Sequence, residues 1–254
     1  MKITRAVVPS LFTVLNMFCG FLSIVYTGQQ DYVLGAWFII LAALFDTLDG
    51  LMARITRSAS DFGIEFDSLS DVISFGAAPA FLVFAVHLNT LEGLGVILSS
   101  MLMIFGGLRL ARFNVQIIGF DKEYFTGLPI PSSAITVASF VLMFYDNTLG
   151  LNNVARDFLA PLVVVLSLLM VTRIKYDALP EFTRHGIKRH PWRFMACIAG
   201  IVAIIVTRGT AIFPFFVLFV LSGPLRAFSV AIWNAMHHVP KVEEEETEAT
   251  TIDL

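Results

Sequence analysis

Long uncharged stretches alternate with short charged segments along almost the whole chain. A helix that crosses a bilayer needs about 20 mostly apolar residues, and the stretches approach or exceed that length. They cover residues 6–30, 32–45, 72–91, 93–108, 128–145, 158–172, 194–207 and 209–225. The second stretch is long enough only if its helix continues through Asp46 and Asp49. The pattern predicts an all-α, polytopic membrane helix bundle with about eight transmembrane helices.

The composition favours the same class of protein. Hydrophobic residues make up 57% of the 254 residues and charged residues only 15%, with a mean hydropathy of +0.79. A soluble domain carries about 25% charged residues. The net charge of −3 arises mostly from the Glu-rich residues 241–254, so the rest of the chain is close to neutral and nucleic acid is excluded as a partner. We expect one transmembrane domain over residues 1–240 and an acidic, disordered cytoplasmic tail over residues 241–254.

The basic residues between the uncharged stretches predict how the protein lies in the membrane. If the N-terminus is cytoplasmic and all eight spans exist, every Lys and Arg except Arg156 and Arg208 falls on the cytoplasmic side. Cytoplasmic loops of membrane proteins are enriched in Lys and Arg. We therefore expect a multi-pass protein of the cell membrane with both termini in the cytoplasm.

Four aspartates interrupt the apolar pattern between the second and third stretches. Asp46 and Asp49 are three residues apart, and Asp67 and Asp71 are four apart, so each pair lies on one face of its helix. The polar residues 54–61 predict a cytoplasmic turn that folds the third helix back against the second. The two acidic faces can then meet at the cytoplasmic interface.

Ionised carboxylates cannot be gathered near a membrane without compensation, because burial and like charges both oppose ionisation. A hard divalent cation such as Mg²⁺, Mn²⁺ or Ca²⁺ prefers oxygen ligands and removes the conflict. Carboxylates that hold such ions commonly face a phosphate-bearing substrate. Three other interpretations remain open at this point: water-exposed aspartates at helix ends, a purely structural role, and a cation or proton pathway.

Small and basic residues are interleaved with the aspartates. The arrangement is Asp46-x2-Asp49-Gly50-x2-Ala53-Arg54-x8-Gly63-x3-Asp67-x3-Asp71. It resembles the signature of the CDP-alcohol phosphatidyltransferases, membrane enzymes in which an alcohol displaces CMP from a CDP-linked lipid. The resemblance implies that residues 46–71 are the catalytic signature of the transmembrane domain.

The resemblance also implies a role for each position of the signature. Asp46, Asp49 and Asp67 would bind Mg²⁺ or Mn²⁺, with Ca²⁺ as an inactive occupant. Asp71 would activate the alcohol and also contact a metal ion. The side chains and backbone expected to bind the CDP-lipid are those of Asp46, Asp49, Gly50, Ala53, Arg54, Ser60, Gly63 and Asn16. For Asn16, in an otherwise apolar helix, a hydrogen bond between helices is an equally good interpretation.

Further stretches resemble one branch of the family, the CDP-diacylglycerol–serine O-phosphatidyltransferases. They are residues 11–20, 67–79, 109–114 and 125–131. This resemblance implies CDP-diacylglycerol and L-serine as substrates, phosphatidylserine as product, contact with membrane lipids and a homodimer. Serine binds as a zwitterion, and the guanidinium groups of Arg109 and Arg112 suit its carboxylate, with Asn114 as a further polar contact. Basic anchors at a helix end are the alternative interpretation of both arginines.

Two other functions remain open on the sequence alone. Within the family, the acceptor could be glycerol 3-phosphate or inositol phosphate, which would require basic residues beyond Arg109 and Arg112. Outside the family, a cation transporter would also use inward-facing carboxylates, although the chain shows no internal inverted repeat.

Overall fold

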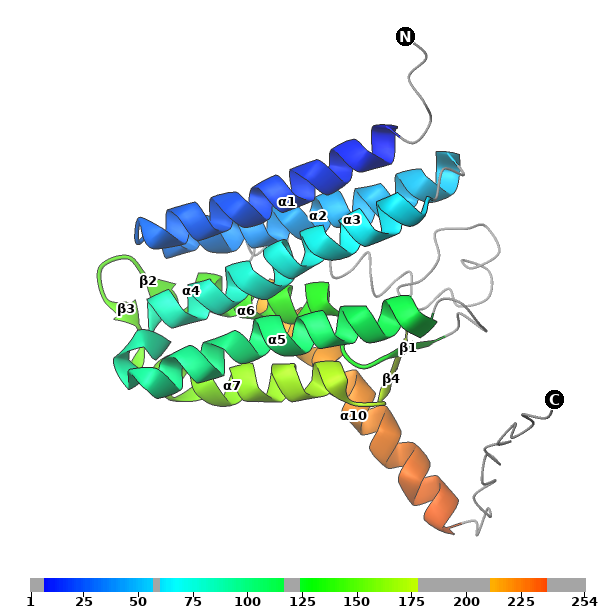
Figure 1. Cartoon of the computed structure of the whole chain (residues 1–254). Coiled ribbons are helices and arrows are strands. Elements are labelled where there is room, and N and C mark those ends of the chain that lie inside the picture. Colours follow the sequence, from blue (N-terminus) through cyan, green and yellow to red (C-terminus); the bar gives the residue numbers. More distant parts are fainter. Residues whose placement is uncertain (1–6, 57–59, 117–123, 178–210, 237–254) are drawn as a thin grey trace, which may run out of the picture.

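The computed structural model describes residues 7–56, 60–116, 124–177 and 211–236 (Figure 1). Nearly all of these residues are helical. The α-helices are α1 (Val7–Gly28), α2 (Tyr32–Thr56), α3 (Asp61–Asp71), α4 (Ala78–Val86), α5 (Gly93–Gln116), α6 (Ile130–Phe144), α7 (Asn153–Val171) and α10 (Ile212–Met236). A π-helical segment, η1 (Val72–Ala77), joins α3 to α4 without a break, and a 3₁₀ turn, η2 (Leu88–Leu91), precedes α5.

Two short antiparallel strand pairs lie at opposite ends of the bundle. Strand β1 (Tyr124–Thr126) pairs with β4 (Lys175–Asp177), with Phe125 opposite Tyr176. Strand β2 (Tyr145–Asp146) pairs with β3 (Gly150–Leu151) and forms the turn between α6 and α7. Figure 1 shows the first pair beside the end of α5 and the second at the far end of the molecule.

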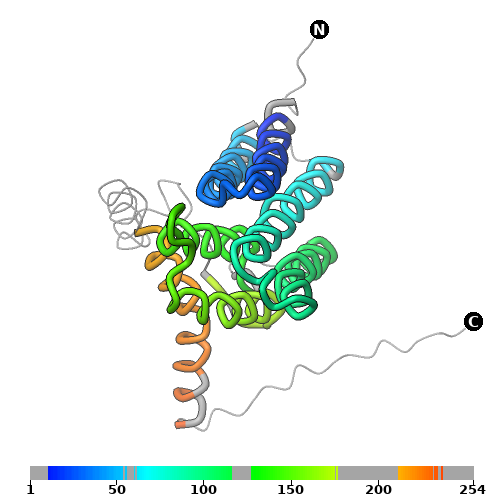
Figure 2. Tube along the Cα trace, turned by 90° about the vertical axis from the view of Figure 1, so that its left-hand side faces the viewer, coloured from blue at the N-terminus to red at the C-terminus, as the bar shows by residue number. Residues whose placement is uncertain are grey.

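The helices pack around α6, whose residues are largely buried. Helix α1 runs along α2 and also along the continuous helix α3–η1–α4. Helix α5 packs on α4 and α7, and α6 lies between α2, α7 and α10. Figures 1 and 2 show α10 crossing the bundle and then extending away from it. The third helix was expected to fold back against the second. The structure confirms this at η1 and α4, which lie within the predicted stretch 72–91 and contact α2, whereas α3, the first part of the same run, packs on α1.

Six helices of the described part are long and apolar enough to cross a membrane. They begin in α1, α2, α3, α5, α7 and α10, whereas α6 is apolar but shorter, with 15 residues. The expected multi-pass membrane protein is confirmed, but the count of eight spans is not. The stretch 194–207 and the tail 241–254 lie outside the described residues. The eighth stretch, 209–225, overlaps α10, which runs farther, to Met236.

One predicted helix boundary is confirmed in the structure and another changes. Helix α2 does continue through both of its aspartates and ends at Thr56. The third span covers Phe62–Val86 rather than residues 72–91. It begins earlier than predicted because the helix includes three carboxylates, Glu65, Asp67 and Asp71, that the uncharged window omitted.

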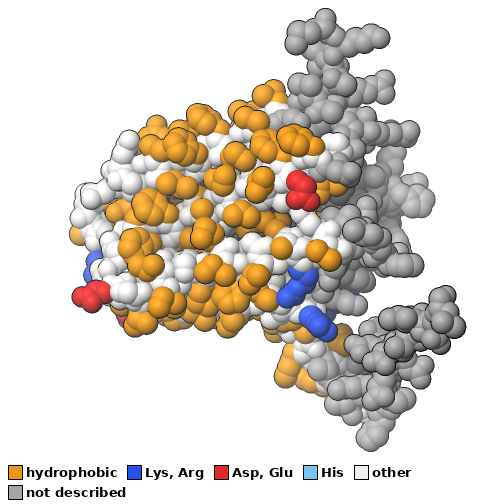
Figure 3. All heavy atoms as spheres, viewed as in Figure 1, with side chains coloured by type: hydrophobic (Ala, Val, Ile, Leu, Met, Phe, Trp, Pro, Cys, Tyr) orange, Lys and Arg blue, Asp and Glu red, His pale blue; other side chains and the backbone are white. Residues whose placement is uncertain are grey.

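Apolar side chains cover the outside of the bundle. Figure 3 shows hydrophobic groups spread over one whole face, with charged groups only near its two ends. Phe21 of α1, Leu94 of α5 and Phe158 of α7 are 56%, 66% and 62% exposed. A soluble monomer rarely exposes contiguous apolar surface of this extent, and lipid is the medium in which such a surface is stable.

Gly127 lies beside the end of α7, at one end of the bundle. Its backbone adopts a positive φ of 79°, and its N–H donates to Ile174 O at 2.8 Å. The next residue, Leu128, donates to Leu169 O at 3.0 Å. A Cβ atom at position 127 would lie 2.3 Å from Met170 O. Both the backbone conformation and the close approach therefore require glycine.

We expect Gly127→Ala to lower the apparent melting temperature of the purified protein in detergent, because it combines a strained φ with a backbone clash. Strain of this kind costs about 1–3 kcal/mol. Gly107→Ala is the matched control: position 107 is in α5 and has no atom within 4 Å of an added Cβ, and alanine favours a helix. Equal melting temperatures for the two variants would contradict the packing described here.

Candidate functional site

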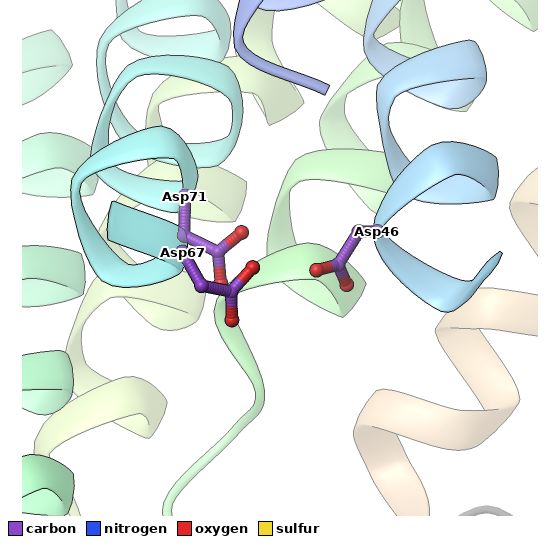
Figure 4. A group of neighbouring side chains, drawn as sticks. All are labelled: Asp46, Asp67 and Asp71. Carbon is purple, nitrogen blue, oxygen red and sulfur yellow. The ribbon is translucent and has the colours of Figure 1, made fainter. Parts of the chain in front are cut away.

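Three carboxylates from two helices meet inside the bundle. Asp46 lies on α2, and Asp67 and Asp71 lie one turn apart on α3. One carboxylate oxygen from each of the three lies within 4.8 Å of the other two. Figure 4 shows Asp67 and Asp71 on one side, pointing across to Asp46 on the other. The spacing of four residues places the α3 pair on one face, and we name these three side chains the acidic cluster.

Asp49 is the fourth aspartate of the signature and has a different environment. Its side chain is buried, and Oδ2 accepts a hydrogen bond from the Thr13 hydroxyl of α1. Its Oδ1 is buried and has no hydrogen-bond partner among the described residues. Asp49 is therefore beside the acidic cluster but not one of the three whose oxygens converge.

Helix α1 supplies a hydrogen bond to the acidic cluster itself. Asn16 is fully buried, and its Nδ2 donates to Asp71 Oδ1 at 3.2 Å. The opposite end of the amide, Oδ1, has no hydrogen-bond partner among the described residues. The structure therefore contains the interhelical hydrogen bond expected for Asn16, and its contact with the CDP-lipid stays a prediction.

Two serine hydroxyl groups, one on α3 and one on η1, donate hydrogen bonds to backbone oxygens of α1. Ser70 Oγ donates to Thr13 O at 3.2 Å, and Ser74 Oγ donates to Asn16 O at 2.9 Å. Sequence analysis missed Thr13, Ser70 and Ser74. The available signal was their spacing: Thr13 precedes Asn16 by three residues, and the two serines are four apart, so each pair shares a helix face.

The π-helical segment η1 begins directly after Asp71. A π-helical turn inserts an extra residue into a helix and is frequent at functional sites. Here Ser74, Phe75 and Gly76 of η1 are all buried. The segment is followed by the buried residues Ala78 and Pro79 at the start of α4.

The three residues expected to bind serine have different neighbours. Arg109 of α5 is buried, its Nε has no hydrogen-bond partner among the described residues, and its charge interacts with that of Asp71. Arg112 is exposed, and its Nη1 donates to Val171 O at 3.0 Å, at the end of α7. Asn114 Nδ2 donates to Ser68 Oγ of α3 at 3.0 Å. Among them, Arg109 interacts with the acidic cluster, whereas the hydrogen bond of Arg112 caps α7.

The residues expected to bind the nucleotide lie toward the end of α2 and at the start of α3. A Cβ at Gly50 would have no neighbour within 4 Å, so packing within the chain does not require glycine there and a ligand has room. Ser60 caps α3, with its Oγ accepting from Gly63 N at 3.1 Å. Ala53 is half-buried, and Arg54 belongs to α2 although its side chain lies outside the described atoms.

The donor set of the acidic cluster suits a hard divalent cation. Three carboxylates this close repel one another when ionised, and Arg109 supplies one positive charge nearby. Oxygen ligands from three side chains match the preference of Mg²⁺ or Mn²⁺ and leave positions for oxygens of a substrate. The cluster therefore has the composition of a metal site that faces a phosphate.

Comparisons with known proteins agree with this arrangement. Over 218 residues the chain is 34% identical to a CDP-diacylglycerol--serine O-phosphatidyltransferase of Helicobacter pylori, covering 86% of this chain and 90% of that protein. It is 34% identical over 182 residues to the protein of the same name from Bacillus subtilis, covering 70% and 93%. It is 38% identical over 178 residues to an archaetidylserine synthase of Methanothermobacter thermautotrophicus, covering 69% and 72%.

The family model for CDP-alcohol phosphatidyltransferases matches residues 6–172. This range runs from the start of α1 to the end of α7 and includes all four aspartates. The helical membrane bundle, the acidic cluster and this match lead to one conclusion: the chain belongs to the CDP-alcohol phosphatidyltransferase family.

Proposed function

We propose that this protein transfers the phosphatidyl group of CDP-diacylglycerol to the hydroxyl of L-serine, releasing CMP and forming phosphatidylserine. The observation that carries the proposal is the convergence of Asp46, Asp67 and Asp71 at the membrane-embedded site of a chain that belongs to this family. The names of its relatives point to serine as the acceptor.

We propose that the acidic cluster binds Mg²⁺ or Mn²⁺, with Asp46, Asp67 and Asp71 as ligands and Asp49 beside them. Ca²⁺ fits the same oxygens as an inactive occupant. When bound, such an ion neutralises charge on the diphosphate and polarises the phosphorus centre. The protein contributes the positions of the ligands, which are fixed by two rigid helices rather than by loops.

Asp71 accepts the proton of the serine hydroxyl in this proposal. The serine oxygen forms a new bond to the phosphorus that carries the diacylglycerol, while the bond from that phosphorus to the CMP oxygen breaks. The electron pair of the broken bond leaves with CMP, and the proton remains on the Asp71 carboxylate. A side chain that takes the proton in the transition state accelerates a reaction about 10²–10⁴-fold.

The remaining signature residues bind the two substrates. Gly50, Ala53, Arg54, Ser60 and Gly63 surround the nucleotide, with Arg54 stabilising the departing phosphate. Arg109 pairs with the serine carboxylate, and Arg112 and Asn114 support this side from α5. The acyl chains stay in the bilayer, and serine arrives from the cytoplasm. The site therefore lies at the cytoplasmic face of the cell membrane, and both termini lie on that side.

The acceptor is tested by CMP release from the purified protein in detergent with CDP-diacylglycerol and Mg²⁺ or Mn²⁺. Serine, glycerol 3-phosphate and inositol phosphate are offered one at a time. We expect CMP release with serine alone, because serine needs one cation for its carboxylate. Release with a phosphorylated alcohol instead would keep the family and refute serine as the acceptor.

Metal binding is tested without turnover, by the melting temperature of EDTA-treated protein. Mn²⁺ at about 100 times its dissociation constant should stabilise the wild type by about 2.7 kcal/mol. Asp46→Asn and Asp67→Asn should lose most of this stabilisation and, with less repulsion between carboxylates, should be no less stable than the wild type without metal. Glu65→Gln, an exposed change on α3, is the matched control. An unchanged metal response in both aspartate variants would exclude the acidic cluster as the metal site.

At saturating Mg²⁺ or Mn²⁺, Asp71→Asn should lower kcat at least 10²-fold and leave the affinity for CDP-diacylglycerol nearly unchanged. Asp46 and Asp67 remain to hold the ion, and the amide keeps the shape of the carboxylate but cannot take the proton. Turnover and binding of the CDP-lipid are measured separately, with Glu65→Gln again as the control. Turnover at the wild-type rate would refute the assignment of Asp71 as the base.

A further inference from the structure

One face of α1 is polar where it meets the aspartates. Thr13 and Asn16 are one turn apart and both buried, 3% and 0% exposed. Thr13 donates to Asp49 on α2, and Asn16 donates to Asp71 on α3. A single helix thus holds one carboxylate on each side of the site. In an apolar bundle such bonds are stronger than in water, because little water competes for the donors.

The contact between α1 and the helix that carries Asp71 contains hydrogen bonds to the α1 backbone as well as the side-chain bond from Asn16. The hydroxyls of Ser70 and Ser74 donate to the backbone oxygens of Thr13 and Asn16, the same two residues whose side chains bind the aspartates. One turn beyond Asn16, a Cβ at Gly20 would lie 2.6 Å from Ser74 Cα. This close approach fixes the position of Asn16 relative to Asp71.

Only one end of the Asn16 side-chain amide has a hydrogen-bond partner among the described residues. Nδ2 bonds to Asp71, while Oδ1 is buried without a hydrogen-bond partner among the described residues. An unsatisfied buried acceptor costs about 1–3 kcal/mol. A residue at this position that served only to join two helices would gain by satisfying both ends or by being apolar. The stability cost favours a role in setting the geometry of Asp71.

We propose that Asn16 is a positioning residue for catalysis: its hydrogen bond to Asp71 Oδ1 fixes the carboxylate so that Oδ2 faces the acceptor hydroxyl. Thr13 holds Asp49 in the same way from the preceding turn. This inference rests on the proposed role of Asp71 as the base. It assigns to α1 a function in the chemical step, rather than in binding the CDP-lipid.

The test compares Asn16→Leu, which keeps the volume and removes the donor, with Asn16→Gln, which keeps a carboxamide donor. Partners of this kind change activity about 10–100-fold when removed. We expect Asn16→Leu to lower kcat by that factor, with the KM values for CDP-diacylglycerol and serine within about threefold of the wild type, and Asn16→Gln to recover part of kcat. Ser23→Ala is the matched control, because Ser23 is fully buried two turns farther along α1 and its hydroxyl has no hydrogen-bond partner among the described residues.

Melting temperatures with and without Mn²⁺ give a second measurement that does not need turnover. We expect Asn16→Leu to be as stable as the wild type without metal and to show a smaller response to Mn²⁺. A raised KM for CDP-diacylglycerol with an unchanged kcat would overturn the inference and make Asn16 a substrate contact. An equal loss of kcat and stability in both Asn16 variants would overturn it in favour of a structural role. If the wild type uses another acceptor, serine is refuted, and the same kcat comparison with that acceptor still decides the role of Asn16.

Discussion

Repulsion between carboxylates in an apolar helix bundle is the constraint from which the other features of this structure follow. Asp46, Asp67 and Asp71 come within 4.8 Å of one another, and Asp49 is buried beside them. Ionised groups in this arrangement must be compensated by cations or by hydrogen-bond donors. Arg109 supplies one charge, α1 supplies two donors, and the remaining charge makes the cluster a strong attractor for a divalent ion. In the proposed mechanism a diphosphate could approach this charge only with such an ion in place, so metal binding and substrate binding would be coupled.

The outer and inner surfaces of the helices differ in composition, and this difference keeps the aspartates and their hydrogen-bond donors in place. Large apolar side chains face outward, where lipid solvates them, and small or hydroxyl-bearing residues face α1 from α3 and η1. Because small residues let helix backbones approach closely, Gly20 brings α1 against Ser74 and the donors within reach of the aspartates. Sites built on helices position their side chains more precisely than sites built on loops.

The sequence predicted the parts of the site that depend on local spacing. Intervals of three and four residues were enough to place each aspartate pair on one helix face, and the apolar stretches located the membrane helices of the described part. The π-helical turn after Asp71 was not predictable, since no composition pattern marks it. The partners of Thr13 and Asn16 were not predictable either, because these hydrogen bonds join residues 36 and 55 positions apart. Nor does a sequence show that Arg112 bonds to the end of α7 while Arg109, one turn earlier, faces the interior.

The difference between these two arginines bears on which alcohol the site accepts. A phosphorylated alcohol would bring about two negative charges into a site already rich in carboxylates and would need several cations around it. Serine brings one carboxylate and one ammonium, so a single guanidinium balances its negative group and the carboxylates nearby favour its positive one. Within the described residues, Arg109 has an unpaired donor and interacts with Asp71, whereas Arg112 already donates to a backbone carbonyl. This distribution of charge favours a zwitterionic acceptor and agrees with the names of the relatives.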